Sequence, residues 1–202
     1  TDITIERAGH VATIVIQRPP HNFFDMSLIK QIATALEEFD GDIDVRAVVL
    51  ASEGKSFCAG ANFGDGSRLD AKGNRPDEAT ANNSGHLYQE AVRIFRSKKP
   101  IIAAVQGAAI GGGLGLAVAA AFRIAAPAAR FAANFTRLGF HPGFGLTYTL
   151  PRLIGQQEAA KLFYTSRRIT GEEALAIGLA DEVVSLADVR RRAQEFAAEI
   201  AV

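Results

Sequence analysis

Three consecutive glycines stand between an apolar stretch and an alanine-rich one, in the segment IGGGLGLA at residues 110–117. If a strand leads into these glycines and a helix leaves them, backbone N–H groups are exposed at the helix start, where the helix dipole adds positive charge. Glycine also removes the Cβ atoms that would hold a ligand away. The segment therefore predicts a site for a phosphate, or for a carbonyl oxygen that becomes negative during a reaction. Tight packing of a helix on a sheet is the alternative that this segment alone leaves open.

Nucleotide-binding patterns do not account for the glycine triplet. A dinucleotide fingerprint, GxGxxG, that used Gly113 and Gly115 would need a third glycine where Val118 stands. The phosphate-binding pattern GxxxxGK[ST] does not occur in the sequence. Neither pattern supports a nucleotide site.

A second backbone-rich segment, GKSFCAGANF at residues 54–63, follows another predicted strand. Together the two segments resemble the signatures of the enoyl-CoA hydratase/isomerase (crotonase) family, FxAGAD and P(I/V)(I/A)AA(V/I)xGxAxGGGxxLA. In this chain the signatures read SFCAGANF and PIIAAVQGAAIGGGLGLAVAAAFRIA. The resemblance extends from VATIVIQRPPHN through LPRLIG and ITGEEALAIGLADEVV to the last predicted helix, and so covers essentially the whole chain.

The resemblance implies an α/β fold, a crotonase-like spiral of ββα units in one domain over residues 1–202, commonly assembled as a homotrimer or a dimer of trimers. It implies an acyl-CoA or enoyl-CoA thioester as substrate, with coenzyme A as part of that substrate and no separately bound cofactor or metal. The N–H groups of Ala61 and Gly112 correspond to the family's oxyanion hole, which holds the thioester carbonyl as an enolate or tetrahedral oxyanion develops. The family's contacts to CoA and the acyl group correspond to Ala59, Gly60, Asn62, Phe63, Gly111 and Phe135.

The catalytic carboxylates of the family's hydratases are absent from this sequence. Those enzymes carry one glutamate two residues beyond the triplet and a second in the next strand and turn, and the pair handles water and a proton. The corresponding residues here are Gly115 and Phe135, and a third position that is acidic in some isomerases and dehalogenases is Gly143. Standard two-glutamate hydration is therefore disfavoured, while isomerisation, hydrolysis and weak hydration remain open. A non-catalytic CoA-thioester-binding or assembly protein of the same fold is the alternative.

His141, in GFHPGFG, is the first candidate to replace the missing acids. It lies in the turn that borders the family's site, and imidazole titrates near neutrality. We expect Phe140 and Phe144 to desolvate the ring and lower its pKa toward that of a neutral base. A turn histidine that only bonds the backbone is an equal alternative.

Tyr88, on the predicted helix before Pro100, is the second candidate, although core packing with a solvated hydroxyl is favoured for it. Cys58 is interpreted as a small buried residue rather than a nucleophile. The weaker candidates are His86, Glu90 and Asp65.

Strands and helices alternate along the chain, which is typical of an α/β fold. The pattern predicts strands over DITIE, VATIVIQRP, VRAVVLASE, IIAAVQG and ADEVVS, and two short strands around Pro127. It predicts helices over SLIKQIATALEEF, HLYQEAVRIFRSKK, LGLAVAAAF, GQQEAAKLFYT, ITGEEALAIG and LADVRRRAQEFAAEIA. Asp25 or Ser27 is the expected cap of the first helix, and Thr170 with Glu173 forms a capping box. The polar, aperiodic residues 62–84 predict a lid-like loop beside the site.

The composition excludes several classes of protein. Lys and Arg total 22, as do Asp and Glu, which leaves no overall field to attract nucleic acid or an anionic membrane. The run Arg190, Arg191 and Arg192 is interpreted as a solvated helix face. A single cysteine provides no disulfide framework and fits a cytoplasmic protein. The apolar residues 101–122 are interrupted by Gln106 and five glycines, and so predict a buried strand and helix rather than a membrane span.

Members of the family usually continue past this last helix into further helices that help cover CoA and build the trimer. Because the sequence stops at Val202, we expect those helices to be missing or truncated.

Overall fold

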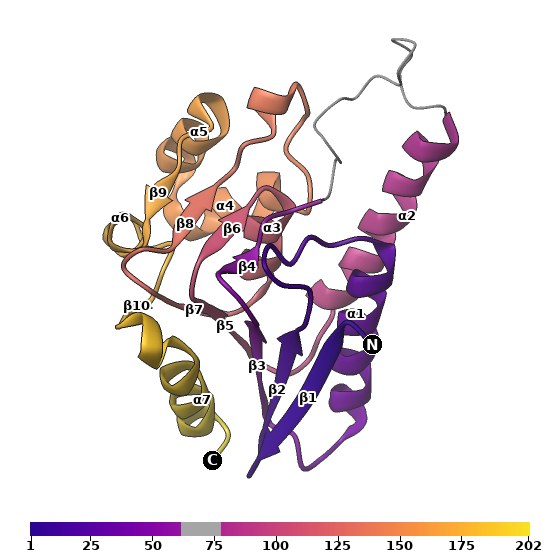
Figure 1. Ribbon diagram of the computed structural model, residues 1–202, viewed down its shortest axis with the longest axis vertical. Coiled ribbons are helices and arrows are strands. Elements are labelled where there is room, and N and C mark those ends of the chain that lie inside the picture. Colours follow the sequence, from indigo (N-terminus) through magenta and orange to yellow (C-terminus); the bar gives the residue numbers. More distant parts are fainter. Residues whose placement is uncertain (62–77) are drawn as a thin grey trace.

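The computed structural model describes residues 1–61 and 78–202, with the backbone alone for residues 78–86. Strands and helices alternate along the chain, as the sequence predicts (Figure 1). The elements in order are β1 (Ile3–Ala8), β2 (Val11–Ile16), α1 (Met26–Gly41), β3 (Ala47–Ser52), β4 (Ser56–Cys58), α2 (Glu78–Phe95), β5 (Ile101–Val105), β6 (Ala108–Ile110), α3 (Gly112–Ala119), β7 (Phe122–Ala125), β8 (Arg130–Ala132), the 3₁₀ turn η1 (Thr136–Leu138), α4 (Leu146–Ile154), α5 (Gln156–Thr165), β9 (Ile169–Thr170), α6 (Gly171–Ala176), β10 (Glu182–Val183), η2 (Leu186–Asp188) and α7 (Val189–Ile200).

A six-stranded sheet forms the larger layer, with the order β1-β2-β3-β5-β7-β10. Strands β1 and β2 form an antiparallel hairpin, and the other neighbours in the sheet are parallel. Every residue of β2 and β5 is buried, which is expected where helices cover both faces of a parallel sheet. Figure 1 shows α1 on one side of this sheet and α7 on the other.

A smaller four-stranded sheet, β4-β6-β8-β9, holds the segments that follow the central strands of the larger one. The chain passes from β3 to β4, from β5 to β6 and from β7 to β8, and the first two passages each return through a helix. Strands β4, β6 and β8 are parallel to one another, and β9 is antiparallel to β8. This repeated passage is the spiral of ββα units that the resemblance implies.

The two N-terminal helix caps that the sequence predicts, at the first helix and at Thr170, are present. The carboxylate of Asp25, not the hydroxyl of Ser27, caps α1 by accepting from the N–H of Leu28 at 2.9 Å. At α6 the Thr170 hydroxyl accepts from the N–H of Glu173 at 3.1 Å, and the Glu173 carboxylate accepts from the N–H of Thr170 at 2.7 Å. The predicted capping box is therefore present.

The structure differs from the sequence-based expectation in two helices. Helix α2 begins at Glu78, inside the region predicted as a loop, and the rest of the predicted lid lies outside the described residues. Helix α4 was not predicted, and it contains Pro151, a residue that usually argues against a helix interior. The apolar residues 101–122 form β5, β6 and α3, as expected. No helix in the described ranges is long and apolar enough to cross a membrane.

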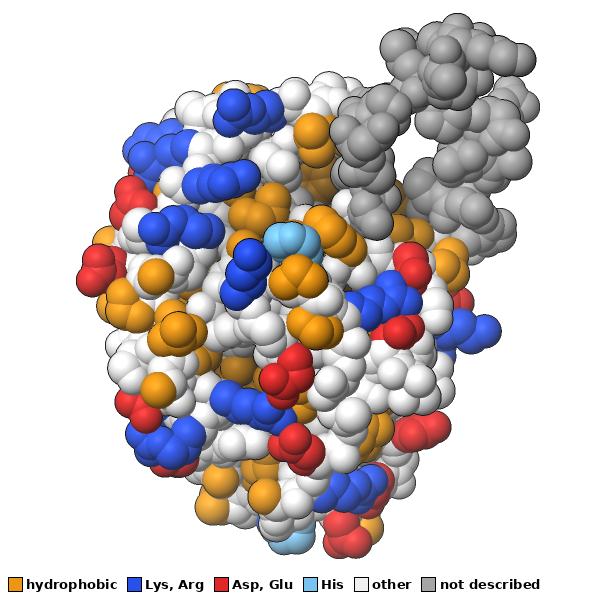
Figure 2. Space-filling model, viewed as in Figure 1, with side chains coloured by type: hydrophobic (Ala, Val, Ile, Leu, Met, Phe, Trp, Pro, Cys, Tyr) orange, Lys and Arg blue, Asp and Glu red, His pale blue; other side chains and the backbone are white. Residues whose placement is uncertain are grey.

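Charged side chains of both signs are interspersed on the face of the molecule shown in Figure 2. On α7, Arg190 pairs with Glu6 and Glu53, while Arg192 pairs with Glu182 and Glu199. Arg191 pairs with carboxylates of its own and the preceding turn. The three arginines therefore form an ion-paired, solvated helix face, as predicted.

Candidate active site

The two glycine-containing segments singled out in the sequence lie against each other in the structure. Gly60 follows β4 with a φ of 92°, a conformation that favours glycine. A Cβ atom at Gly60 would lie 2.8 Å from the carbonyl oxygen of Ile110 and 3.9 Å from the backbone nitrogen of Gly112. The end of β4 thus packs directly on the first turn of α3.

Gly113 makes this close packing possible. A Cβ atom on Gly113 would overlap the carbonyl oxygen of Cys58 and would lie 2.7 Å from its carbonyl carbon. Strands β4 and β6, which lead into the two segments, are parallel neighbours with Cys58 opposite Ala109. The backbones approach as closely as glycine allows, which fixes the Ala61 segment relative to the helix start.

Two backbone N–H groups at this junction have no protein acceptor among the residues that the structure describes. Gly111 is the N-cap of α3 and donates its own N–H to Ala132 at 2.8 Å. Gly112 is the first residue of the helix, where N–H groups have no intrahelical acceptor. Within the described part of the chain, neither the N–H of Gly112 nor that of Ala61 donates to a protein acceptor. The predicted pair of donors is thus available to a ligand oxygen.

The loop after β2 holds the segment before Ala61 in place through hydrogen bonds. Its main residue, Asn22, was not singled out from the sequence. Asn22 is fully buried and donates through Nδ2 to the carbonyl oxygens of Glu53 and Ser56, both at 2.7 Å. The N–H of Ala59 donates to the carbonyl oxygen of His21 at 3.0 Å. Asn22 has a φ of 50°, which asparagine tolerates better than most residues, and this tolerance is the one signal in the sequence for its role.

Aromatic side chains occupy the space beside Gly112 and Gly115. A Cβ atom at Gly115 would lie 2.5 Å from Cβ of Phe144, and one at Gly112 would lie 2.5 Å from Cε1 of Phe24. Phe144 is 2% exposed, and its ring lies 5.6 Å from that of Phe24 and 6.1 Å from that of Phe95. A glutamate at position 115 therefore does not fit unless Phe144 moves.

The Tyr88 side chain fills the space beside Gly143, as Phe144 fills the space beside Gly115. A Cβ atom at Gly143 would overlap the Tyr88 hydroxyl and would lie 2.8 Å from its Cζ. The side chain is 42% exposed, and partial burial raises the pKa of the Tyr88 phenol. Its hydroxyl has no hydrogen-bond partner among the described residues. The phenol is therefore protonated at neutral pH and accessible to solvent beside Gly143.

Phe135 and Asn134 border the glycine triplet from the other side. A Cβ atom at Gly111 would lie 3.9 Å from Cζ of Phe135 and 3.1 Å from Oδ1 of Asn134. Both side chains are half-buried. The predicted contact residue Phe135 is thus beside the donors, and Asn134 is a polar neighbour that sequence reasoning did not single out.

The environment predicted for His141 is wrong. The residue is exposed, and its Nδ1 lies 3.0 Å from the carbonyl oxygen of Pro142. Since a carbonyl oxygen only accepts, Nδ1 carries the proton of this bond. Phe144 does not desolvate the imidazole, because its positive φ of 54° accompanies a ring buried against Phe24 and Phe95. A catalytic role for His141 stays a prediction.

The remaining candidates contribute no reactive group in the described structure. Cys58 is buried, as expected, and burial raises the pKa of its thiol to about 12. Glu90 forms an ion pair with Arg93 on the same helix. The candidates that lie outside the described residues are Asn62, Phe63, Asp65 and the side chain of His86.

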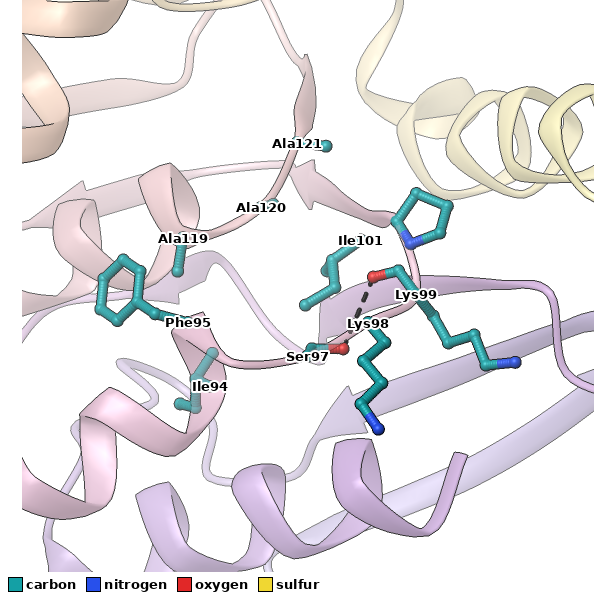
Figure 3. A pocket seen from close by; sticks show the side chains of 10 residues that line it. Ile94, Phe95, Ser97, Lys98, Lys99, Ile101, Ala119, Ala120 and Ala121 are labelled. Carbon is teal, nitrogen blue, oxygen red and sulfur yellow. Dashed lines mark hydrogen bonds between the residues drawn. The ribbon is translucent and has the colours of Figure 1, made fainter. Parts of the chain in front are cut away.

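A pocket of about 420 Å³ lies at the opposite end of α3 from Gly112 (Figure 3). Phe95 points toward Ala119 on one side of it, and Lys98 and Lys99 extend away on the other. The Ser97 hydroxyl and the Lys98 N–H donate to the Asp40 carboxylate. The pocket lies between the end of α2, the start of β5 and the end of α3, and it is separate from the candidate site.

Comparison with known proteins agrees with this geometry. The profile of the enoyl-CoA hydratase/isomerase family matches residues 6–202. The chain is 35% identical over 193 residues to the putative enoyl-CoA hydratase/isomerase YngF of Bacillus subtilis, covering 95% of this chain and 72% of that protein. It is also 35% identical over 205 residues to the short-chain-enoyl-CoA hydratase of Clostridium acetobutylicum, covering 98% of this chain and 75% of that one.

Solved structures show the same likeness. Pseudomonas aeruginosa DspI superimposes with a TM-score of 0.90 at 33% identity, covering 99% of this chain and 74% of that one. An enoyl-CoA hydratase from Bacillus anthracis gives a TM-score of 0.89 at 34% identity, covering 100% of this chain and 77% of that one. The chain therefore belongs to the enoyl-CoA hydratase/isomerase, or crotonase, family.

Proposed function

We propose that this chain is an acyl-CoA thioester enzyme in which the N–H groups of Ala61 and Gly112 form an oxyanion hole. The observation that carries the proposal is the packing of Gly60 against the backbone nitrogen of Gly112, which leaves two N–H groups without protein acceptors among the described residues. Such donors act where negative charge develops, and removal of one typically costs ~10²–10³ in rate. The relatives' names, which specify enoyl-CoA hydratases and isomerases, support a CoA thioester as the substrate.

The thioester would lie along the segments already described. Ala59, Gly60 and Gly111 supply backbone beside the two donors, and Phe135 borders the acyl side, with Asn62 and Phe63 as predicted further contacts outside the described residues. No separately bound cofactor or metal enters this scheme. Assembly as a homotrimer or a dimer of trimers, and a cytoplasmic location, are further proposals that rest on the family.

Two-glutamate hydration does not fit the side chains present. Phe144 fills the space next to Gly115, and the Tyr88 ring fills the space next to Gly143. We rank Tyr88 ahead of His141 as the proton-transfer group, because the phenol lies beside Gly143 whereas the imidazole is exposed.

A second candidate function is favoured by the absence of carboxylates at positions 115, 135 and 143. Loss of all three acids is what a non-catalytic CoA-thioester-binding or assembly protein would also show. A panel of acyl-CoA and enoyl-CoA thioesters, followed by mass spectrometry, separates the two functions. Conversion of any member supports the enzyme, and binding of thioesters without conversion across the panel supports the binding protein.

The donor itself is tested by a matched pair of variants. A Cβ at position 112 would meet the far end of the Phe24 ring, so both variants carry Phe24→Leu. Gly112→Pro removes the N–H and is compatible with the first position of a helix, whereas Gly112→Ala adds a Cβ and keeps the N–H. We expect turnover to fall by ~10²–10³ in the proline variant relative to the alanine variant. Equal turnover in the two folded proteins would reject the assignment.

A further inference from the structure

Basic side chains are concentrated in one stretch of this otherwise balanced chain. Lys and Arg total 22 over all residues, as do Asp and Glu, but residues 126–171 hold six basic residues against one acidic residue, Glu158. The six are Arg130, Arg137, Arg152, Lys161, Arg167 and Arg168. Figure 2 shows blue side chains gathered over α5, β9 and β8, at the upper left of the view. The molecule therefore has a local positive field although its total charge is zero.

The small sheet places two of these arginines side by side. Arg130 of β8 lies opposite Thr170 of β9, and the next pair along the strands, Phe131 with Ile169, is buried. Side chains alternate between the two faces of a sheet, and Arg168 stands two residues before Thr170. Arg130 and Arg168 are therefore diagonal neighbours on the solvent face, and both are exposed.

The turn η1 adds a third arginine beside the end of α5. The N–H of Arg137 donates to the hydroxyl oxygen of Ser166 at 3.2 Å, and the Thr136 hydroxyl lies 2.8 Å from the same oxygen. Ser166 is buried and directly precedes Arg167 and Arg168 in the chain. These hydrogen bonds hold Arg137 next to the other two, so four arginines share one surface.

The arginines of this surface have no carboxylate partner in the described part of the chain. There, the exposed side chains of Arg137, Arg167 and Arg168 form no hydrogen bond or ion pair, and the Arg130 guanidinium donates to the carbonyl oxygens of residues 128 and 129. On α7, by contrast, each of the three arginines pairs with carboxylates. The charge of the four arginines is therefore available to an anionic partner.

Three carboxylates are close to this surface in the chain, and two of them are engaged. Glu158 forms an ion pair with Lys161 on α5. Glu173 accepts from the N–H of Thr170 in the capping box of α6. Glu172 is exposed, and it forms no ion pair with any described residue. One unpaired carboxylate beside four arginines leaves the surface positive.

Apolar groups are exposed among these charges. Leu138, next to Arg137 on η1, is 40% exposed, and Tyr164, three residues before Arg167 on α5, is 82% exposed. A polyphosphate chain would pair with the arginines but would give the leucine side chain no apolar partner. The surface of a lipid bilayer supplies both, because anionic headgroups lie directly above acyl chains and tyrosine favours the depth between them.

We propose that this part of the molecule, here called the arginine surface, binds bilayers that contain anionic phospholipids. It consists of Arg130, Arg137, Leu138, Tyr164, Arg167 and Arg168. The headgroup oxygens accept hydrogen bonds from the guanidinium groups, while the leucine and tyrosine side chains enter the region below the headgroups. The proposal does not use the backbone donors at Ala61 and Gly112, and so stands apart from the proposed function.

The first experiment measures sedimentation of the full chain with vesicles of two compositions. One is phosphatidylcholine alone, and the other is phosphatidylcholine and phosphatidylserine in equal amounts. We expect binding to the mixed vesicles only, and weaker binding as the salt concentration rises, because salt screens the attraction. Arg137→Gln/Arg167→Gln/Arg168→Gln should lower the partition coefficient about 100-fold, since each basic residue near an anionic membrane contributes about fivefold.

The matched control removes three charges from the ion-paired face of α7, as Arg190→Gln/Arg191→Gln/Arg192→Gln. It has the same net charge as the first variant, but α7 lies away from α5 (Figure 1) and its arginines already pair with carboxylates. We expect its partition coefficient to change by less than about threefold. Equal losses in the two variants, or unchanged binding in the first, would overturn the proposal. Thermal unfolding verifies that both variants are folded.

A fluorescence experiment locates the contact. The chain contains no tryptophan, so a single introduced tryptophan reports its own surroundings. Tyr164→Trp places it in the arginine surface, and Ile43→Trp places it at a position between α1 and β3 that is 86% exposed. With mixed vesicles we expect the emission of Tyr164→Trp to move to shorter wavelength and that of Ile43→Trp to stay. A shift in both variants, or in neither, would reject the arginine surface as the contact.

The outcomes are separate from those of the proposed function. If the wild type does not bind the mixed vesicles, the proposal is wrong, and binding of a single-stranded RNA oligonucleotide by the same arginines would then identify a different polyanion as the partner. The Kd for propionyl-CoA is measured on the same samples. Vesicle binding without propionyl-CoA binding would reject the proposed function and leave the arginine surface standing.

Discussion

The two sides of Gly112 are built on different principles. On one side, Gly60 and Gly113 bring the backbones of β4 and α3 into contact, and two N–H groups there have no acceptor in the described part of the chain. On the other side, Phe144 and Tyr88 occupy the space beside Gly115 and Gly143. The first side is made of backbone and is independent of side-chain chemistry. The second side is made of side chains, and here they are aromatic.

This difference shows which part of the chemistry is tied to the fold. The donors exist because two segments pack at glycine-limited distance, so their removal disrupts the packing as well. A carboxylate in the same pocket is replaceable, because an aromatic ring that fills its volume keeps the core closed. We therefore expect an acyl-CoA enzyme of this family to keep its backbone donors even where its proton-transfer groups differ.

The largest effect is expected from Gly113→Ala, which breaks the backbone side. The new Cβ would overlap the Cys58 carbonyl, and neither backbone segment has room to move, so we expect the free energy of unfolding to fall by roughly 4 kcal/mol or more. Denaturant unfolding measures this loss. Alkylation of Cys58 provides a second reading, because burial holds the pKa of this thiol at about 12 in the intact protein.

Gly41→Ala is the matched control for this substitution. Gly41 ends α1, and no heavy atom lies within 4 Å of a Cβ placed there. Its effect should be below about 1 kcal/mol. Similar losses in the two variants would contradict the claim that Gly113 is required by close packing.

The second prediction concerns the aromatic side and couples two positions. Gly115→Ala should destabilise the chain by ~1–3 kcal/mol, because the new Cβ would lie 2.5 Å from Cβ of Phe144. In a Phe144→Gly background the same change should cost much less, since the obstructing ring is gone and glycine adopts the φ of 54° without strain. A double-mutant cycle on the free energy of unfolding measures this coupling. Additive losses would show that Phe144 does not occupy the space next to position 115.

The sequence predicted the backbone side better than the aromatic side. The glycine pattern indicated which segments meet, and Asp25 and Thr170 marked helix starts through local capping chemistry. The burial of Phe144 follows from a left-handed backbone conformation that no local pattern indicates for phenylalanine. For the same reason the turn around His141 was predicted with the wrong aromatic neighbour.

The start of α2 and the whole of α4 were also not predicted from the sequence, for physical reasons. Helix α2 begins in EATANNSG, where Asn, Ser and Gly have low helix propensity, so composition favoured a loop. Helix α4 contains Pro151, and tertiary packing of Leu146, Leu150 and Ile154 outweighs the local penalty. In both cases the fold overrides the local preference.

The third prediction uses pH to identify the proton-transfer group. If Tyr88 is the proton donor, it acts in its protonated form, and because its pKa is raised, activity should persist through neutral pH and fall only above about pH 10. A histidine base would instead lose activity as the pH falls through the ordinary imidazole range near 6.5. The pH dependence of kcat distinguishes the two. An acidic limb near 6.5 with no alkaline limb would contradict the role of Tyr88.

The smallest effect is expected from His141→Gln. If the imidazole were the base, this change would lower turnover by ~10²–10⁴. Its exposure and its bond to the Pro142 carbonyl lead us to expect a change below about threefold, with unchanged affinity for propionyl-CoA. Steady-state kinetics at neutral pH is the measurement, and a hundredfold loss would restore His141 to the site.

The central claim, that the Gly112 and Ala61 N–H groups hold the thioester oxygen, is tested most directly by difference infrared spectroscopy of bound propionyl-CoA labelled with ¹³C at the carbonyl. Hydrogen bonds from two backbone donors polarise the carbonyl and lower its stretching frequency relative to the thioester in water. We predict this lowering in the wild type and in Phe24→Leu/Gly112→Ala, and a clearly smaller shift in Phe24→Leu/Gly112→Pro, which keeps only the Ala61 donor. A carbonyl frequency that is the same in water, in the wild type and in both variants would contradict the account.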